Sequence, residues 1–217
     1  MAQYAVVGLG RFGATLALQL MKMGHDVVGI DSDRHVIETL ADTLTYTAIA
    51  DVTDERALRE LSPTTYDAVV VAIGENLQAS LLCVVHLKNM GIENIWVKAT
   101  TQAHHLILSR LGVSRIIHPE EEMGARTAQA LAYPMIREYM ALGDRQYIVE
   151  VQVTDKMAGV SLAELLSGAK GEVSGILVKR REQLFPCPSE QFLIEPGDIV
   201  LLVGVRKFLM QLAARFM

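Results

Sequence analysis

A glycine-rich turn near the N-terminus constrains this chain more than any other stretch. The turn, Gly8-Leu9-Gly10-Arg11-Phe12-Gly13, follows an apolar strand-like run and precedes residues 14–21, whose apolar side chains recur at helical spacing. Gly8 permits a tight turn, Gly10 lets a phosphate approach the backbone, and Gly13 lets the helix pack on the strand. The free N–H groups at the start of the helix favour an anion. This strand, turn and helix together predict a site for a nucleotide or dinucleotide.

An acidic residue stands where such a site needs one. A second strand-like run, residues 25–30, leads to Asp31, which lies 18 residues beyond Gly13 (31 minus 13). A carboxylate about 20 residues after the glycines binds the ribose in dinucleotide-binding folds. Asp31 would repel a 2′-phosphate, so we expect a ribose without one. In the alternative interpretation the glycines only turn the chain and Asp31 caps the next helix.

Composition and charge exclude several classes of protein. The 217 residues are 51% hydrophobic, which suffices for one large domain or two small domains with a real core. The net charge of −5 has no long basic run, so we expect no nucleic-acid partner, and the short cluster at 179–181 is predicted to be a solvated turn. The apolar runs are too short to span a membrane and no signal pattern opens the chain. Isolated Cys83 and Cys187 suit a reducing cytosol.

Strand-like and helix-like stretches alternate from residue 3 to about residue 118. The strand-like runs are residues 4–7, 27–30, 46–49, 68–72, 95–97 and 115–117. Such alternation predicts an α/β fold, a Rossmann-like doubly wound parallel sheet. Ligands of these sheets bind beyond the carboxyl ends of the strands. We therefore expect site residues where strands end, at Asp31, Asp51, Ala72 to Asn76, Lys98 and the segment around Glu120.

The pattern changes in the last hundred residues. A helix is predicted from Glu120 to about Met140, kinked or divided at Pro134, and residues 142–145 are predicted to be a linker. Strands at 147–153, 174–179 and 199–203 and helices at 162–166 and 206–216 then predict a smaller α+β domain. We assign residues 1–142 to a nucleotide-binding domain with a crossover helix and residues 146–217 to a second domain.

The sequence contains no obvious catalytic pattern. All six histidines lie before residue 119, and the adjacent His104 and His105 would point about 100° apart on a helix, which favours surface or helix-facing roles over metal binding. No Ser/His/Asp order, nucleophile elbow or Gly-Lys-Ser/Thr phosphate loop is present. The nucleotide is therefore expected to be bound without being chemically changed, as in a sensor. A small NAD-dependent oxidoreductase is the alternative.

Four segments carry a resemblance to a known family: residues 8–13, 71–80, 95–99 and 115–120. They resemble the RCK-type regulatory subunits of Ktr/Trk bacterial potassium uptake systems, and the resemblance covers the chain as an RCK N-terminal domain followed by an RCK C-terminal domain. It implies a cytoplasmic homo-oligomer, an octameric ring, on the inner face of the membrane beneath a potassium transporter subunit of the KtrB/TrkH type. It also implies activation by ATP and inhibition by ADP, or else binding of NAD(H) as a redox sensor.

The resemblance implies roles for individual residues. Arg11 would reach the nucleotide phosphates, including a terminal phosphate across a dimer interface, although a merely exposed helix arginine would look the same. Asp31 would bind the ribose, Asp51 and Val52 would flank the adenine, and Ala72, Ile73 and Gly74 would pass under the nucleotide. The predicted set is Gly8, Gly10, Arg11, Phe12, Gly13, Asp31, Ser32, Asp51, Val52, Ala72, Ile73, Gly74, Asn76, Lys98 and Glu120.

The last residues of this set have competing interpretations. Asn76 and Lys98 would lie near the phosphates, but Lys98 also suits a solvated lysine at a strand end. Glu120 would join Mg²⁺ or another cation to the phosphates. Alternatively, Glu120 and the two acids after it only complement a helix N-terminus.

The second domain departs from the family at one place. Many Ktr subunits bind cyclic di-AMP there, through apolar and proline contacts and an arginine that precedes an Ala-Lys pair. The matching position here is Gly168, followed by Ala169-Lys170. Ile176, Pro186 and Pro188 suit such a pocket, but without the arginine the sequence does not predict cyclic di-AMP binding.

Overall fold

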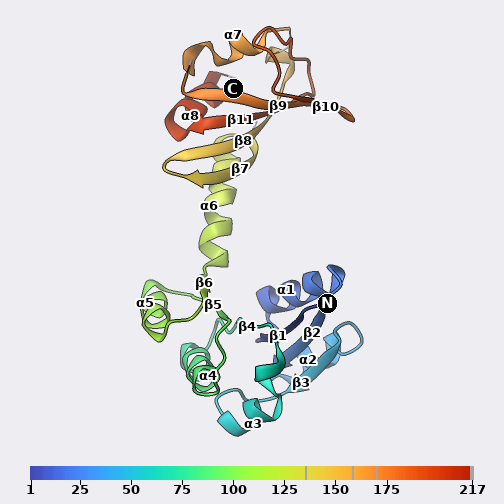
Figure 1. The fold of residues 1–217 in the computed structure, drawn as a ribbon, viewed down its shortest axis with the longest axis vertical. Coiled ribbons are helices and arrows are strands. Elements are labelled where there is room, and N and C mark those ends of the chain that lie inside the picture. The colour runs from blue at the N-terminus through green and yellow to red at the C-terminus, as the bar shows by residue number, and fades with distance from the viewer. Residues whose placement is uncertain (135, 158, 170, 216–217) are drawn as a thin grey trace. The chain divides into compact units, whose positions relative to one another are not determined.

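The computed structural model describes residues 1–134, 136–157, 159–169 and 171–215 (Figure 1). The chain divides into two compact units, Met1–Glu120 and Glu121–Met217. None of the helices in the described ranges combines the length and apolar character that a membrane span requires.

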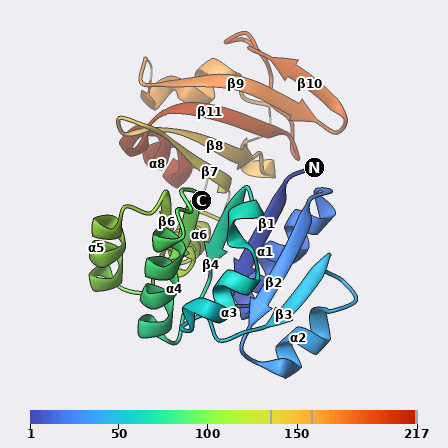
Figure 2. The same ribbon diagram turned by 60° about the horizontal axis from the view of Figure 1, so that its bottom comes forward.

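The first unit is built on a six-stranded parallel sheet with the order β3-β2-β1-β4-β5-β6 (Figure 2). Its strands are β1 (Gln3–Val7), β2 (Asp26–Asp31), β3 (Tyr46–Ile49), β4 (Ala68–Val71), β5 (Ile95–Lys98) and β6 (Arg115–Ile117). The helices between them are α1 (Arg11–Lys22), α2 (Arg34–Leu40), α3 (Glu55–Glu60), α4 (Leu77–Asn89) and α5 (Gln102–Leu111). The strand order reverses between β1 and β4, which is where ligands bind in doubly wound sheets.

Alternating side chains of the strands cover the two faces of this sheet. On one face Val6 and Val27 pack with Ala17 of α1 and Ile37 of α2. On the other face the strand residues pack against α3, α4 and α5 through Leu58, Cys83, Val84, Leu87 and Leu108. The strand residues on this face are Ala5, Val7, Ile30, Ala48, Val69, Val71, Ile95 and Val97. Because residues 5–7 of β1 and the whole of β4 are buried on both faces, they form continuous apolar runs, as expected for parallel strands.

The second unit contains a five-stranded antiparallel sheet with the order β10-β9-β11-β8-β7. Its strands are β7 (Ile136–Gly143), β8 (Gln146–Gln152), β9 (Val173–Arg180), β10 (Gln183–Pro186) and β11 (Ile199–Val205), and its helices include α7 (Leu162–Leu166) and α8 (Arg206–Arg215). Leu165 of α7 and Leu209 and Leu212 of α8 pack on Val178, Val200 and Leu202 of the sheet. A Rossmann-like parallel sheet followed by a smaller α+β domain is thus confirmed as the fold class.

The predicted helix from Glu120 to Met140 is wrong in its second half. The helix α6 (Pro119–Ala132) ends before Pro134, and the strand β7 follows. A helix could not place Ile136 beside Val151 of β8, where the structure buries it with an exposed fraction of 6%. Tertiary burial therefore overrides the helical spacing of this stretch.

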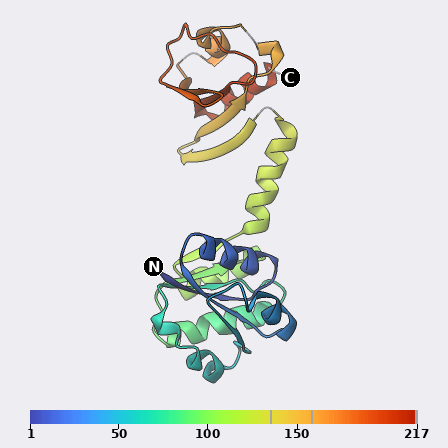
Figure 3. The same ribbon diagram turned by 90° about the vertical axis from the view of Figure 1, so that its right-hand side faces the viewer.

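The predicted linker at residues 142–145 is also wrong, because Leu142 and Gly143 end β7 and only Asp144 and Arg145 form the turn of the β7–β8 hairpin (Figure 3). Gly143, Asp144 and Arg145 all have positive φ angles, of 96°, 46° and 63°, which suits a tight hairpin turn. The boundary differs accordingly, since residues 121–142, which we assigned to the first domain as a crossover helix, group with the second unit. Phe216 of the last predicted helix and Lys170 of the Ala-Lys pair lie outside the described residues.

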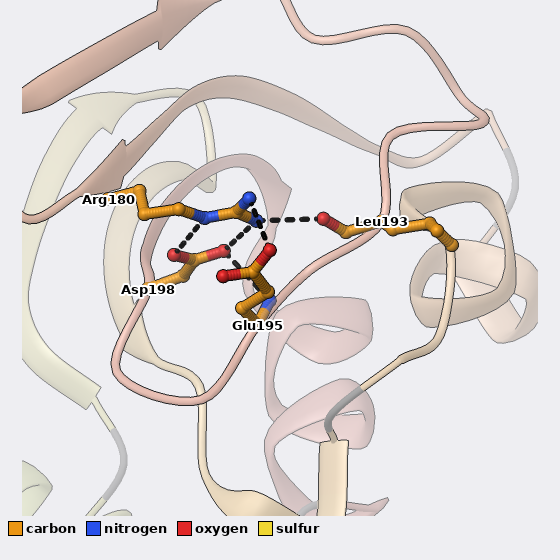
Figure 4. A network of polar contacts seen from close by, with 4 residues as sticks. All are labelled: Arg180, Leu193, Glu195 and Asp198. Atoms are coloured by element: carbon orange, nitrogen blue, oxygen red, sulfur yellow. Dashed lines mark hydrogen bonds and ion pairs between the residues drawn. The ribbon is translucent and has the colours of Figure 1, made fainter.

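The prediction of a solvated turn at 179–181 is correct only for Arg181, which is exposed in the turn after β9, because Lys179 and Arg180 belong to β9 itself. Arg180 donates through Nε and Nη2 to the two oxygens of Asp198 at 2.9 and 2.8 Å, and through Nη1 to Glu195 at 2.7 Å (Figure 4). Burial, which leaves Asp198 1% exposed, would raise the pKa of that carboxyl, but the hydrogen bonds and charge of Arg180 lower it overall. This bidentate pair joins β9 to the segment that leads into β11.

Candidate functional site

A cavity of about 940 Å³ opens in the first unit at the carboxyl ends of the parallel strands. Every residue of the predicted set lines it except Gly13, which lies beneath the glycine turn. Glu75, which lies within the expected Ala72 to Asn76 segment, also lines it, as do residues that the sequence prediction omitted: Val7, Ile30, Ala50, Thr53, Gln78, Ala79 and Leu82. Gln78, Ala79 and Leu82 lie on one face of α4, near its start. Including the first turns of the helix that follows Asn76 would therefore have added these residues to the predicted set.

The glycine turn needs its outer two glycines for steric reasons. Gly8 has a φ of +87°, and a Cβ there would lie 3.0 Å from the backbone nitrogen of Ile73. A Cβ at Gly13 would overlap the carbonyl oxygen of Gly8 and lie 3.2 Å from the Cβ of Ala72. A Cβ at Gly10, in contrast, would meet no described atom within 4 Å. Gly10 therefore leaves the cavity side of the turn open, as phosphate approach requires.

The start of α1 is prepared for an anion. Its N-cap is Gly10, which offers no side-chain hydrogen bond, and its first turn contains no acidic residue. The first N–H groups of a helix have no partner within the helix and carry partial positive charge. Arg11 is exposed at this point and lines the cavity, and its guanidinium makes no ion pair with any described residue. The positive end of the α1 dipole and the positive charge of Arg11 therefore both face the cavity.

Asp31 supports the glycine turn in addition to lining the cavity. Its Oδ2 accepts a hydrogen bond from the backbone N–H of Leu9 at 2.6 Å, and its Oδ1 accepts one from Asp33 at 2.9 Å. A carboxylate has about four acceptor positions, so two remain for the hydroxyl groups of a ribose. The alternative in which Asp31 caps α2 is wrong, because Asp33 is the N-cap of that helix and accepts from His35.

The loop after β3 forms another wall of the cavity. Thr53 donates through its backbone N–H at 2.9 Å and through its hydroxyl at 2.7 Å to Oδ1 of Asp51. These two hydrogen bonds hold the pKa of the Asp51 carboxyl below its ordinary value. Val52, which lies between Asp51 and Thr53 in the sequence, is buried, with an exposed fraction of 6%. The loop thus presents a fixed carboxylate and an apolar surface to the cavity.

Lys98 and Glu120 form an ion pair at the opposite end. The Nζ of Lys98 lies 2.6 Å from Oε1 of Glu120, and the Lys98 side chain is only 12% exposed, which rules out a solvated lysine. The hydrogen bond from Lys98 lowers the pKa of Glu120, whose own side chain is 69% exposed. The Lys98 ammonium also lies 5.9 Å from the centre of the Phe12 ring. Both a cation and a carboxylate are therefore available to phosphate and metal at this end.

The histidines do not form a metal centre. No group of three or more His, Cys, Asp or Glu side chains in the described ranges is arranged to hold a metal ion. His104 is fully buried and faces the interior, where burial and then the charge of His118 lower its pKa. His105 and His118 stack with ring centres 5.0 Å apart.

Comparison with known proteins agrees with this architecture. The TrkA-N domain family model matches residues 4–119. Ktr system potassium uptake protein A from Bacillus subtilis is 37% identical over 205 residues, which cover 94% of this chain and 92% of that protein. The GsuK RCK domain crystal structure superimposes with a TM-score of 0.67 at 15% identity, over 99% of this chain and 47% of that one, and the GsuK channel bound to NAD gives 0.62 at 15%, over 97% and 38%. The chain therefore belongs to the family of Ktr system potassium uptake proteins, with a TrkA-N domain in its first unit.

Proposed function

We propose that this chain is the nucleotide-sensing regulatory subunit of a potassium transporter and that it binds ATP or ADP in the cavity of its first unit. It would act in the cytoplasm, on the inner face of the membrane, against a transporter subunit of the KtrB/TrkH type. The observation that supports the proposal most strongly is the exposed guanidinium of Arg11, which lies in a glycine turn suited to binding an anion. An arginine fork is a strong and selective phosphate ligand, whereas hydride transfer to or from NAD does not require one.

The residues around the cavity suit the parts of an adenine nucleotide. The Asp51–Thr53 loop offers an apolar wall and a carboxylate for the adenine end, and Asp31 retains acceptor positions for the ribose. The phosphates would meet the N–H groups of α1 and the side chain of Arg11. A nucleotide bound in this way is held by groups that do not change its covalent structure, in keeping with a regulatory role and not an enzymatic one.

A cation fits the same arrangement. Glu120 uses Oε1 for Lys98, and its exposed carboxylate keeps acceptor positions for Mg²⁺ or another cation beside the phosphates. When such a cation binds, it would neutralise phosphate charge that Arg11 and Lys98 leave uncompensated. Because Glu120 lies in the first turn of α6, a ligand that moves this carboxylate acts directly on the start of that helix.

Regulation also requires that the protein have a second conformation and that an assembly transmit the change between the two conformations. A ligand shifts a conformational equilibrium only by its difference in affinity for the two states, so ATP and ADP must contact the protein differently. The helix α6 has no buried residue, and its Met123 and Leu131 are 58% and 77% exposed. Exposed apolar side chains of this kind favour burial against another copy of the chain, in keeping with the octameric ring that the family resemblance implies.

Calorimetric titration of the purified protein with ATP, ADP, NAD and NADH tests the proposal. We expect both adenine nucleotides to bind more tightly than either nicotinamide dinucleotide, and ATP and ADP to differ from each other. Binding of NADH at least about tenfold tighter than ATP, a difference of about 1.4 kcal/mol, would instead support a redox sensor. Light scattering of the same samples should show an assembly larger than a dimer.

A further inference from the structure

His86 links two walls of the candidate nucleotide cavity. It lies near the end of α4, its side chain is 15% exposed, and its Nε2 lies 3.0 Å from the carbonyl oxygen of Thr53. Thr53 belongs to the loop after β3, and the first turns of α4 line the same cavity through Gln78, Ala79 and Leu82. We propose that His86 is a positioning residue that fixes the adenine-facing loop against α4 and makes nucleotide affinity depend on pH. This proposal rests on the function proposed above.

The second ring nitrogen of His86 faces the carboxylate of Glu55. Nδ1 of His86 is buried and has no hydrogen-bond partner among the described residues, yet it lies 3.6 Å from Oε2 of Glu55 on α3. A neutral ring that donates to Thr53 presents a bare lone pair to that carboxylate. A protonated ring presents an N–H to each oxygen, so it holds the loop and α3 together.

The surroundings determine the direction of the pH effect. The charged group beside the ring is Glu55, whose other oxygen lies 2.6 Å from Arg59. The Asp51 carboxylate of the adjoining loop accepts from Thr53. His86 also stands in the last turn of α4, where the helix dipole favours a cation. Protonation therefore stabilises the loop in the conformation that lines the cavity. We expect nucleotide affinity to be higher at about pH 6 than at about pH 8.

Two substitutions distinguish the effect of the hydrogen bond to Thr53 from the effect of protonating the His86 ring. In His86→Gln the amide nitrogen takes the place of Nε2 and can still donate to Thr53, but the side chain has no charge to gain. In His86→Leu both contacts are lost while the volume is roughly kept. His35→Gln is the matched control, because His35 is an exposed histidine of α2 that does not line the cavity.

Calorimetry with ADP between about pH 6 and pH 8, the range in which histidine changes its charge, provides the readout. The phosphate groups of ADP also change their protonation near this range. Each affinity is therefore divided by the affinity of His86→Gln at the same pH. At the upper pH we expect wild type and His86→Gln to agree, and His86→Leu to bind about three- to tenfold more weakly, as for one lost hydrogen bond. At the lower pH wild type and His35→Gln should bind about three- to tenfold more tightly than His86→Gln.

Each failure has a distinct meaning. If the ratio of wild type to His86→Gln does not change with pH, or if His86→Leu binds like wild type, the role of His86 is wrong and the proposed function stands. If wild type binds neither ADP nor ATP, the proposed function is wrong. Hydrogen exchange of the residue 51–54 amides, measured without nucleotide, then still tests the link to the loop. His86→Leu should accelerate that exchange and His86→Gln should not, and equal exchange in all variants would refute the link. The Gln comparison remains valid if His86→Leu does not fold.

Discussion

Two glycine substitutions three residues apart should separate folding from nucleotide binding. Gly10→Ala places a Cβ on the open side of the turn, where it meets no described atom within 4 Å, and Gly13→Ala drives a Cβ into the carbonyl oxygen of Gly8. Gly10 has a φ of −62° and a ψ of −172°, which alanine adopts without strain. The first variant should therefore damage the site, and the second should damage the fold.

The magnitudes follow from these contacts. Gly10→Ala replaces a glycine N-cap by alanine, which costs about 0.5–1 kcal/mol of stability. It also holds a phosphate away from the N–H groups of α1, and the loss of one charge-assisted hydrogen bond lowers nucleotide affinity about 10- to 100-fold. At Gly13 the clash is with backbone that cannot rotate away, so we expect about 3 kcal/mol of strain, offset by about 1 kcal/mol of helix propensity. The net loss of about 2 kcal/mol corresponds to a fall in melting temperature of roughly 8–10 °C.

Thermal denaturation without ligand and calorimetric titration with ADP measure the two effects separately. Gly10→Ala should melt within about 5 °C of wild type and bind ADP weakly. Gly13→Ala should melt well below wild type. A Gly10→Ala variant that binds ADP with wild-type affinity would refute the assignment of the phosphates to this turn. A Gly13→Ala variant as stable as wild type would refute the packing argument.

Three further substitutions test other parts of the account. Arg11→Ala should leave adenosine binding nearly unchanged in calorimetry but remove most of the difference between ATP and ADP, because one charge-assisted contact contributes about 1.5–3 kcal/mol; an unchanged ratio would contradict this. Glu120→Gln should abolish the Mg²⁺ dependence of ATP binding, and titrations with and without Mg²⁺ that still differ would refute the cation role. Asp198→Ala should destabilise the second unit by about 1.5–3 kcal/mol in urea denaturation, because it removes the bidentate hydrogen bonds from Arg180 while Glu195 still pairs with that arginine. The pKa of Asp198 is lowered by folding, so its stabilising effect is present above the unfolded pKa of about 4 and lost as the pH falls through the folded pKa; Asp198→Ala should flatten this acid dependence, and an unchanged dependence would count against the pair.

The first unit could be predicted almost completely from the sequence because its signals are local. Each strand is a short apolar run, each helix has its own spacing, and a parallel sheet places all strand ends on one side. The position of Lys98 and Asp51 in one cavity follows from that topology alone. The contacts that orient them, such as the pair of Lys98 with Glu120 or the two hydrogen bonds from Thr53 to Asp51, depend on side-chain conformations that periodicity does not encode.

The second unit was harder to predict because its elements depend on distant partners. Residues 136–143 have apolar side chains at spacings that suit a helix, but pairing with β8 and the burial of Ile136 make them a strand. Arg180 looked like part of a solvated basic turn because its partner, Asp198, lies 18 residues later in the sequence. Long-range pairing of this kind is visible only once the antiparallel sheet is assembled.

Nucleotide-dependent transport tests the central claim most directly. The chain would be reconstituted with a Ktr-type membrane subunit in potassium-loaded vesicles, and uptake of rubidium-86 would be measured with ATP, ADP, NADH or no nucleotide. We predict faster uptake with ATP than with ADP, no response to NADH, and loss of the difference between ATP and ADP in Arg11→Ala although that variant still binds to the vesicles. Equal uptake with ATP and ADP in the wild-type protein, or control by NADH, would contradict the account.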